Sequence, residues 1–505
     1  MKAFVFFSCL LGIIGLDLGS LSKSEQVEFK NDFRQNEDVL PFDRPSISIL
    51  RKSKKKVFAH YFTQFPISID NKDPKSDYYS EQYLNPLGEK GKHKEYGGYL
   101  RARPLPRASN SSPNWRAIDF GAEIKLATDI GIDGFACNIL SFTGRHWEKT
   151  KMLFSVAQNT DRNFKIMIMP DMNSVVGKNP DQLEDIVSTL SKYKSAYRLE
   201  DGRLVVAPYN AQKKTASWWK AWLNNMHRKG IDIAFVPVFQ GWAKYAEEFS
   251  SISYGMSDWG VRSPSRQVTW KEVPKRAKNI LSKVKVQRRN LNSAGSTEVW
   301  MMPVAPQDFR PRAYAYWEAD NSAAFRLMWM NAIEGDADWV QLITWNDYAE
   351  NTMISPNTAT KYGFYDLTAF YVSWFKLGRM PVIKRDVLYY FYRNSTSSAK
   401  PENSLQKKVF VPARGSDEPK DEIELLAFLT KPGRLEIEIA GKKYSKEFGS
   451  GIQSFKVPAV EGTPKFKLIR NGAVEISFNG DVTISNKIIY QNLLYFSGSN
   501  SRKNI

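Results

Sequence analysis

Residues 338–356 read DWVQLITWNDYAENTMISP, an apolar run that ends in a group of Trp, Asn, Asp, Tyr and Glu residues. The run is continuous rather than alternating, which is typical of a strand buried on both faces of a parallel sheet. Two carboxylates, Asp347 and Glu350, follow three residues apart. The stretch therefore predicts a buried strand at 339–344 that ends in a turn with two acidic groups.

Seven similar apolar runs precede this strand, and amphipathic stretches separate them. Alternation of short buried strands with helices predicts parallel strands in βα units. Eight such units over residues 56–384 predict an α/β fold of the (β/α)8 TIM barrel type, and an open doubly wound sheet is the alternative. The predicted strands span 57–62, 133–140, 164–170, 204–208, 233–239, 253–258, 299–304 and 339–344. The helices with the clearest apolar stripes span 115–131, 216–230, 323–335 and 365–377.

Near residue 385 the apolar pattern changes from continuous to strictly alternating, as in LEIEI at 435–439 and VEISF at 474–478. Such alternation predicts antiparallel strands with one buried face, and the Asn-Gly pairs at 471–472 and 479–480 predict hairpin turns. We expect a C-terminal antiparallel β-sandwich domain over 385–495, which packs on the barrel or binds carbohydrate, and a frayed tail over 496–505. Within the barrel, the long Tyr-rich loop 63–114 predicts an ordered lid or wall over a site.

The N-terminus has the features of a secretory signal peptide over residues 1–20. Met1 and Lys2 give a positive start, residues 3–16 are apolar, and small residues follow. An anchor that is not cleaved is the alternative. We expect a polar linker over 21–55 and a monomeric, secreted protein, extracellular or periplasmic, with no membrane segment after cleavage.

The chain carries 72 Lys and Arg against 53 Asp and Glu, a formal net charge of +19. The positive residues are dispersed and accompany no nucleic-acid-binding motif, so we expect no nucleic-acid partner. An acidic polysaccharide is an alternative ligand for such a surface. Beyond the signal region Cys137 is alone, and the four His residues are far apart, so we expect neither a disulfide nor a metal site. No nucleotide-binding motif follows any strand, and no cofactor is expected.

A candidate site follows from the rule that the active site of such a barrel lies at the C-terminal ends of its strands. Aromatic, amide and acidic residues collect there, the types that stack on sugar rings and hydrogen-bond their hydroxyls. The candidate substrate-binding residues are His60, Tyr61, Asn138, Asp171, Asn173, Tyr209, Gln240, Trp242, Asp258, Trp345, Asn346 and Tyr348.

Hydrolysis of a glycosidic bond takes two carboxyl groups, one to protonate the leaving oxygen and one to activate water or attack. Asp347 and Glu350 are close enough in sequence to push their two pKa values apart, which suits an acid and a base. The alternative is that one of them caps the next segment or pairs with an Arg. Asp133 begins a strand, so its position alone predicts a structural role.

Four segments together resemble glycoside hydrolase family 71, the α-1,3-glucanases or mutanases. They are VFAHYF at 57–62, DIGIDGFACNI at 129–139, PDMN at 170–173 and ITWNDYAENTMISP at 343–356. The resemblance implies a secreted (β/α)8 barrel with a β-sandwich that cleaves α-1,3-glucan with inversion and without a cofactor. It implies that Asp347, Glu350 and Asp133 are essential carboxylates and that His60 contacts substrate. Resemblance and location assign Glu350 as the general acid and Asp347 as the base.

The chain also departs from that family. The family usually continues the motif with Gly-Glu-Ser-His, where residues 349–352 read Ala-Glu-Asn-Thr, and loop 63–114 is longer than expected. The segment AENTMISP also resembles the strand end of the endo-α-mannosidases of glycoside hydrolase family 99. The alternatives are therefore an α-mannosidase-like or other α-glycan hydrolase on the same barrel, or a non-catalytic polysaccharide-binding protein.

Overall fold

The computed structural model describes residues 39–174, 177, 179–283, 299–401 and 405–502 of the 505-residue chain. The predicted signal peptide and the first part of the predicted linker, residues 21–38, lie outside the described residues. None of the helices in the described ranges combines the length and the apolar character needed to cross a membrane.

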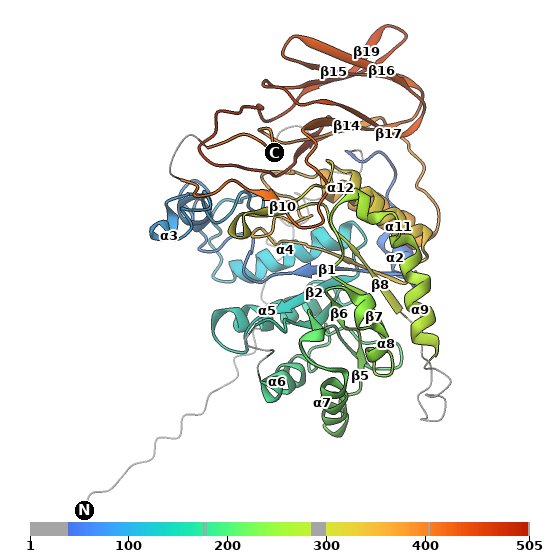
Figure 1. The fold of residues 1–505 in the computed structure, drawn as a ribbon. Coiled ribbons are helices and arrows are strands. Elements are labelled where there is room, and N and C mark those ends of the chain that lie inside the picture. Colours follow the sequence, from blue (N-terminus) through green and yellow to red (C-terminus); the bar gives the residue numbers. More distant parts are fainter. Residues whose placement is uncertain (1–38, 175–176, 178, 284–298, 402–404, 503–505) are drawn as a thin grey trace, which may run out of the picture. The chain divides into compact units, whose positions relative to one another are not determined.

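A nine-stranded parallel sheet forms the centre of the fold (Figure 1). Its strands lie in the order β5-β4-β3-β2-β1-β11-β8-β7-β6, and every neighbouring pair is parallel. Nearly all their residues are buried, as continuous apolar runs require. The strands are β1 Lys56–Tyr61, β2 Gly134–Ile139, β3 Lys165–Pro170, β4 Leu204–Val206, β5 Ile233–Phe235, β6 Val238–Phe239, β7 Gly255–Asp258, β8 Val299–Val304 and β11 Trp339–Leu342.

The predicted strand 233–239 is divided into β5 and β6, the two strands at the ends of the sheet order. Pro237 lies between them and has no N–H to donate to a ladder. The segment still bonds on both sides. Val236 N–H donates to the carbonyl of Val206 at 3.0 Å, and β6 pairs with β7. The fold is therefore mixed α/β with a parallel sheet, whose two end strands are consecutive in the chain.

Helices separate the strands along the chain, as the sequence predicts. Helix α7 shows how local sequence sets the two ends of a helix. The Thr215 hydroxyl caps its first turn, and Gly230 follows its last turn with φ of 75°. Its buried residues are Trp219, Trp222 and Met226. The main helices are α4 Trp115–Asp129, α5 Gly144–Thr160, α6 Pro180–Leu190, α7 Ala216–Arg228, α9 Val273–Lys283, α11 Ala323–Glu334 and α12 Gly363–Leu377.

Residues 39–55 are not a linker, contrary to the prediction. They form a helix, α2 Ile47–Arg51, and a bridge between Phe42 and Ile383. Phe42 is fully buried, with its ring 5.3 Å from that of Phe370 on α12. A few apolar side chains in a polar background are thus enough to fix this segment on α12, because each is covered by core residues.

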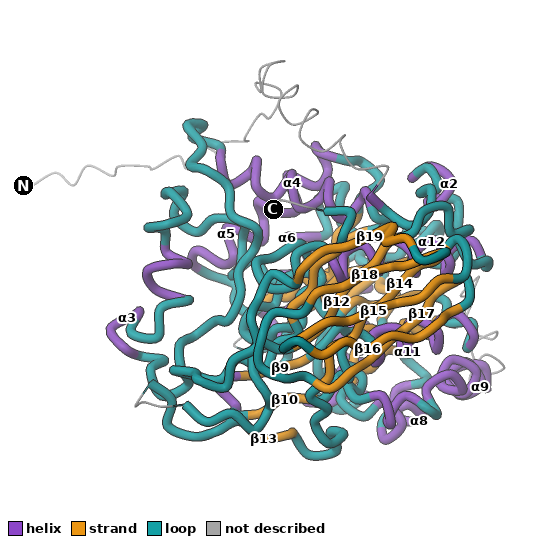
Figure 2. Tube along the Cα trace, turned by 90° about the horizontal axis from the view of Figure 1, so that it is seen from above, coloured by secondary structure: helices purple, strands orange, loops and turns teal. Residues whose placement is uncertain are grey.

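The C-terminal part consists of two antiparallel sheets that share one apolar cluster, and Figure 2 shows their strands gathered in one region. Helix α12 packs on the first sheet through Phe364 against Phe391 and Phe370 against Phe428. The first sheet holds β17 Gly451–Pro458, β14 Glu422–Leu429, β12 Val387–Tyr392 and β20 Phe496–Ser499. The second holds β16 Lys442–Phe448, β15 Gly433–Ile439, β18 Lys465–Arg470 and β19 Ala473–Asn479.

Two details of the predicted C-terminal part are wrong. Residues 496–499 are not a frayed tail but strand β20, which pairs with β12 over Tyr389–Tyr392. The Asn471-Gly472 pair forms the expected hairpin turn with φ of 50° and 81°, whereas Gly480 has no positive φ and sits against the Tyr392 ring. Gly480 therefore allows close packing against Tyr392. The Asn479-Gly480 pair does not form a hairpin turn, although its sequence is the same as that of the Asn471-Gly472 pair.

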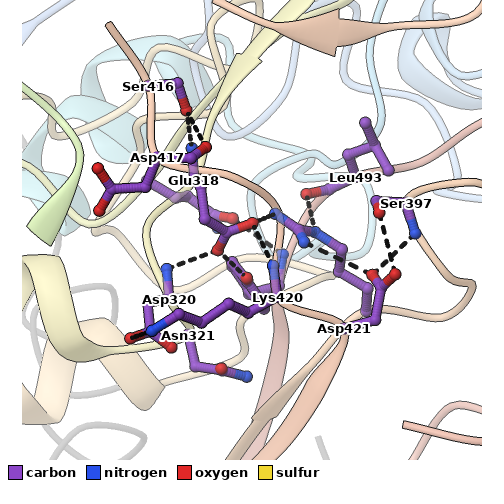
Figure 3. A network of polar contacts seen from close by, with 12 residues as sticks. Glu318, Asp320, Asn321, Ser397, Ser416, Asp417, Lys420, Asp421 and Leu493 are labelled. Atoms are coloured by element: carbon purple, nitrogen blue, oxygen red, sulfur yellow. Dashed lines mark hydrogen bonds and ion pairs between the residues drawn. The ribbon is translucent and has the colours of Figure 1, made fainter. Parts of the chain in front are cut away.

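A buried ion pair joins the loop after β10, Ala315–Trp317, to the end of β12 (Figure 3). Glu318 is fully buried, and its Oε2 lies 3.0 Å from Nη2 of Arg393, which is 4% exposed. The Asp320 N–H donates to Glu318 Oε1 at 2.6 Å, and the Tyr495 hydroxyl donates to the same oxygen. Because each partner has further hydrogen bonds, the pair can remain charged inside the protein.

We expect Arg393→Met to lower the free energy of unfolding by about 3–5 kcal/mol, because it leaves the Glu318 carboxylate buried without its cation. Denaturant unfolding of the full chain measures this. The control is Lys407→Met, which removes an exposed partner 3.8 Å from Glu95 and should cost less than about 1 kcal/mol. Equal losses in the two variants would contradict the account of this ion pair.

Candidate active site

The turn after β11 holds Asp347 in a fixed orientation. Asp347 is 5% exposed, and its Oδ1 accepts hydrogen bonds from the N–H groups of Ala349 and Glu350, both at 2.9 Å. Its own N–H donates to Oγ1 of Thr344 at 2.7 Å. The carboxylate thus organises the turn that carries Glu350, and the two acids form one structural unit.

Arg310 connects Glu350 to a further carboxylate. It ends strand β9, Asp308–Arg310, and its Nε and Nη2 each lie 2.7 Å from the Asp308 carboxylate. The same Nη2 lies 2.8 Å from Glu350 Oε2. Arg262, which is 3% exposed, lies 3.4 Å from Asp308. The site therefore holds fixed positive charge beside its carboxylates, which reduces the cost of keeping them ionised.

Burial raises the pKa of both Asp347 and Glu350 above the usual carboxyl range. For Asp347, the two backbone N–H donors and Arg310 reverse part of that rise. For Glu350, Arg310 lowers the pKa while the negative charge of Asp347 raises it. The Glu350 side chain remains 29% exposed. Two neighbouring carboxyls with raised pKa values, one of them open to solvent, suit proton transfer.

An aromatic group lies beside the carboxylates. The rings of Tyr209 and Trp259 are 4.5 Å apart, and Trp259 is 5.0 Å from the His60 ring. Gln240 donates a hydrogen bond to the Tyr209 hydroxyl at 2.7 Å. Burial raises the pKa of Tyr209, and the charge of Glu350 raises it further, so the two side chains are within electrostatic reach of each other. The structure thus brings together His60, Tyr209 and Gln240.

His60 and Asn138 present buried polar atoms toward this group. Burial lowers the pKa of His60 to about 3, which the nearby Asn138 amide partly offsets. Gln341 Nε2 lies 3.2 Å from His60 Nδ1 and is a donor, so the neutral ring carries its proton on Nε2. That Nε2 and both polar atoms of the Asn138 amide have no hydrogen bond of standard geometry within the described residues. The Asn138 amide lies close enough to influence the pKa values of both His60 and Asp171, and a hydroxylated ligand would complete the hydrogen bonds of this group.

The loop 63–114 is folded and supplies Tyr99 to the site. It contains η3 Tyr79–Tyr83 and α3 Gly88–Gly91, and its apolar residues share a cluster with Tyr348. Burial raises the pKa of Tyr99 to about 12, and the charge of Asp347 contributes to the rise. Tyr99 stacks on His93 with ring centroids 4.6 Å apart. The loop therefore forms a wall next to Asp347.

Asp133 does not lie in this site, contrary to the prediction from resemblance. It precedes β2, a strand of six residues that spans about 20 Å, whereas the other candidates follow the strand ends. Its Oδ2 accepts a hydrogen bond from Val57 N–H and pairs with Lys376 Nζ, both at 2.7 Å. Asp133 therefore balances the buried ammonium of Lys376, on helix α12, at the N-terminal end of the sheet.

Tyr61 and Trp345 also lie outside the site, because side chains alternate along a strand and these two face the helices. Both are fully buried against α4. The Tyr61 hydroxyl donates to Glu123 Oε2 at 2.6 Å, and Trp345 Nε1 donates to Glu123 Oε1 at 3.1 Å. Burial raises the pKa of Glu123 to about 8. The predicted substrate contacts of Tyr61 and Trp345 are therefore wrong.

Asn346 and Tyr348 support the turn instead of reaching substrate, again contrary to the prediction. The Asn346 amide accepts from Phe62 N–H at 2.8 Å and donates to the carbonyls of Phe62 and Phe65 at 2.9 and 3.0 Å. Tyr348 is fully buried with its hydroxyl 3.1 Å from that of Ser355. The polar groups of both side chains form hydrogen bonds within the protein, so they are not available to a ligand.

Trp242 and Asp258 are structural for the same reason. Asp258 accepts hydrogen bonds from the N–H groups of Trp242, Gly241 and Gly260 at 2.6 to 2.9 Å, which fix its carboxylate on the backbone. The Trp242 ring packs on Trp300 at 5.0 Å and is 5% exposed. The predicted sugar contacts of these two residues are therefore wrong.

Asp171 and Asn173 remain at the predicted strand end. Asp171 Oδ1 accepts from Asn173 N–H at 2.9 Å, and Asn173 accepts from the Asn210 amide at 2.5 Å. Burial raises the pKa of Asp171. Asn173 is exposed, so both residues stay candidates for an outer part of a binding site.

Sequence reasoning missed Arg310 and Arg262, and it did not select Trp259 as a candidate although that residue lies at the end of the sixth predicted strand. Trp259 directly follows the predicted Asp258, and its ring faces the site because the preceding carboxylate turns away. Arg310 lies on a short strand that pairs antiparallel with β10, outside the main sheet. The polar Asp-Phe-Arg run after the seventh predicted strand was the available signal.

Residues 109–504 match glycosyl hydrolase family 71. The chain belongs to this family. It is therefore a glycoside hydrolase, as the resemblance implied. It is 25% identical over 403 residues to the glucan endo-1,3-alpha-glucosidase agn1 of Schizosaccharomyces pombe, a match that covers 74% of this chain and 90% of that protein.

Two further likenesses are weaker. The chain is 22% identical over 414 residues to a mutanase of Penicillium rubens, with 76% of this chain and 86% of that protein covered. The solved structure of a family 99 endo-alpha-mannosidase from Bacteroides thetaiotaomicron superimposes with a TM-score of 0.46 at 13% identity, covering 64% of this chain and 98% of that one.

We expect Asp133→Asn to lower the free energy of unfolding by about 3–5 kcal/mol, because the Lys376 ammonium loses its buried partner. The kcat of this glycoside hydrolase should change less than about tenfold, since Asp133 touches no group of the site. Denaturant unfolding and initial rates below the unfolding transition separate the two effects. The double variant with Lys376→Met should recover part of the stability. A folded Asp133→Asn protein without activity would overturn the structural assignment.

Proposed function

We propose that this protein is a secreted, monomeric endo-α-1,3-glucanase that inverts the anomeric configuration, with Asp347 and Glu350 as its catalytic pair. The observation that carries the proposal is the shared turn of these two acids, where burial raises both pKa values and Arg310 supplies the opposing charge. The relatives named for α-1,3-glucan cleavage support the substrate. The resemblance supports inversion and secretion.

The barrel closure is part of the same proposal. Segment 233–239 hydrogen-bonds to β4 through β5 and pairs with β7 through β6, so both ends of the sheet order lie on one stretch of chain. A bridge between Tyr209 and Val238 adds a contact across this seam. These contacts support a sheet that closes into a (β/α)8 barrel with its mouth at Asp347 and Glu350.

The hydrogen-bond pattern supports one distribution of the two roles. Asp347 accepts two backbone N–H bonds, which favour its ionised form, so it acts as the base that activates water. Glu350 accepts no such pair of backbone N–H bonds, and the negative charge of Asp347 raises its pKa. It therefore stays protonated to higher pH and acts as the acid that protonates the leaving oxygen. The Nε2–H of His60 and the rings of Tyr209 and Trp259 would hold the sugar beside them.

We expect Asp347→Asn and Glu350→Gln each to lower kcat by about 10²–10⁴-fold, the usual contribution of a positioned acid or base. Release of reducing ends from α-1,3-glucan measures this. Glu334→Gln, an exposed acid 3.8 Å from Lys271, is the matched control and should keep normal activity. Near-normal rates in a folded Asp347 or Glu350 variant would remove that residue from the mechanism.

Arg310→Met should raise both carboxyl pKa values, because it removes the cation that favours their ionised forms. The base must be ionised and the acid protonated, so both limbs of the pH profile of kcat/KM should move to higher pH by about one unit. The matched Arg310→Lys variant keeps the charge and should move the profile less. A profile that stays in place, or moves to lower pH, contradicts the role of Arg310.

A substrate panel and the product anomer test the proposal as a whole. We expect soluble product from α-1,3-glucan and little from α-1,4- or α-1,6-glucans or mannans, and NMR of the fresh product should show the β-anomer. Product from mannan alone would favour the α-mannosidase alternative. Binding to glucan without product from any polymer would favour a non-catalytic binder. Retention on a sulfated or uronate polymer that survives moderate salt would favour an acidic polysaccharide as the ligand.

A further inference from the structure

A cavity of about 320 Å³ lies where helix α12 meets the C-terminal sheets, and it shares no residue with the carboxylate site. Its walls come from the start of α12, from strands β12 and β19, and from the chain around β20. The lining includes three aromatic side chains, Tyr362, Tyr390 and Phe478, and five polar ones, among them Lys361, Asn479, Asp481 and Arg502. The volume is at the lower end of the range of small-ligand sites.

Neighbouring side chains hold two of these aromatic rings, Tyr390 and Tyr362, in place. The Tyr390 ring stacks on Phe466 with centroids 5.3 Å apart and an interplanar angle of 9°, and the Asp481 N–H donates to the Tyr390 hydroxyl at 3.1 Å. The Arg502 guanidinium lies 4.0 Å from the centre of the Tyr362 ring. Rings that are already fixed lose little entropy when a ligand stacks on them, so the cavity is preorganised.

The charges around the cavity are nearly balanced, which selects against an anionic ligand. Lys361 and Arg502 are cations, and Asp481 is an anion. Arg502 is in turn paired with the buried Asp366 through two hydrogen bonds at 2.7 and 3.0 Å. Flat rings beside a carboxylate, an amide and an ammonium group, without a net field, match a neutral ligand with many hydroxyl groups.

The cavity is also linked to the catalytic turn by a short segment. Only residues 351–360 separate Glu350 from Lys361 in the chain. Within that segment Ser355 contacts the Tyr348 hydroxyl, and the N–H and carbonyl of Asn357 bond to Lys361. A ligand in the cavity would therefore lie next to the segment that leaves the active-site turn.

We propose that this cavity is a second carbohydrate-binding site, which takes a neutral hexose segment of the polysaccharide outside the catalytic cleft. The identity of the sugar rests on the proposed α-glucanase function. Tyr362 and Phe478 offer the stacking surface, and Asn479, Asp481 and Lys361 hydrogen-bond the hydroxyls. The site keeps an insoluble polymer on the enzyme while another stretch of it enters the cleft.

The test uses the full chain with Glu350→Gln to prevent hydrolysis, and it measures retention on insoluble α-1,3-glucan. Tyr362→Ala and the exposed Asn479→Ala should each weaken binding about three- to tenfold, the effect of losing one aromatic or polar contact. Tyr193→Ala, another half-buried tyrosine, and Ser477→Ala, on β19, are the matched controls and should bind normally. Thermal unfolding of each variant shows that it is folded. Equal binding by Asn479→Ala, Tyr362→Ala and the controls overturns the second site.

Hydrolysis by the Tyr362→Ala variant with Glu350 intact separates this inference from the proposed function. We expect its rate on short soluble α-1,3-oligosaccharides to be normal and its rate on insoluble glucan to fall several-fold. Normal rates on both substrates overturn the second site and leave the catalytic proposal intact. If the unchanged protein releases sugar from neither substrate, the proposed function fails, and the assigned ligand fails with it.

Discussion

The burial of strand β11 on both faces is the constraint on which the candidate active site depends. All four of its residues are buried, and its one polar side chain, Gln341, contacts His60 inside the protein rather than water. The polar residues that follow must therefore satisfy one another at the end of the sheet. Asp347 does so by accepting two N–H bonds of its own turn, and that turn fixes the position of Glu350.

Buried carboxylates are neutralised by cations to different extents in the candidate site and in the rest of the protein. Asp133 with Lys376, and Glu318 with Arg393, are pairs in which the acid has its cation at 2.7 to 3.0 Å and supports the fold. Arg310 instead divides its guanidinium between Asp308 and Glu350, and Glu350 remains partly open to solvent. An incompletely neutralised, accessible carboxyl can exchange a proton with a ligand, which a saturated pair cannot do.

The sequence alone predicted most of the parallel sheet, because its strands are continuous apolar runs that differ from the alternating runs of the C-terminal sheets. It also predicted that Asp347, Glu350 and His60 lie at the same edge of the sheet, where the strands end. It failed where side-chain direction decides, since neighbouring residues of a strand end face opposite sides. His60 points to the site and Tyr61 to helix α4, although both satisfy the same pattern.

Long-range partners were the second kind of failure. Nothing near Asp133 in sequence reveals Lys376, 243 positions later, and nothing near Glu350 reveals Arg310 on a strand outside the main sheet. The resemblance to the family supplied the chemistry but assigned Asp133 to it. Only the position of that residue at the start of β2 shows that it lies at the other end of the sheet.

The titration of the two site carboxyls tests the central claim most directly. Carbon-13 NMR of the full chain, with Asp347→Asn and Glu350→Gln used to assign the signals, follows both groups without substrate. The account predicts that both titrate above the ordinary value of about 4 and that Glu350 keeps its proton after Asp347 has lost its own. A Glu350 that ionises at the ordinary value, or before Asp347, would contradict it.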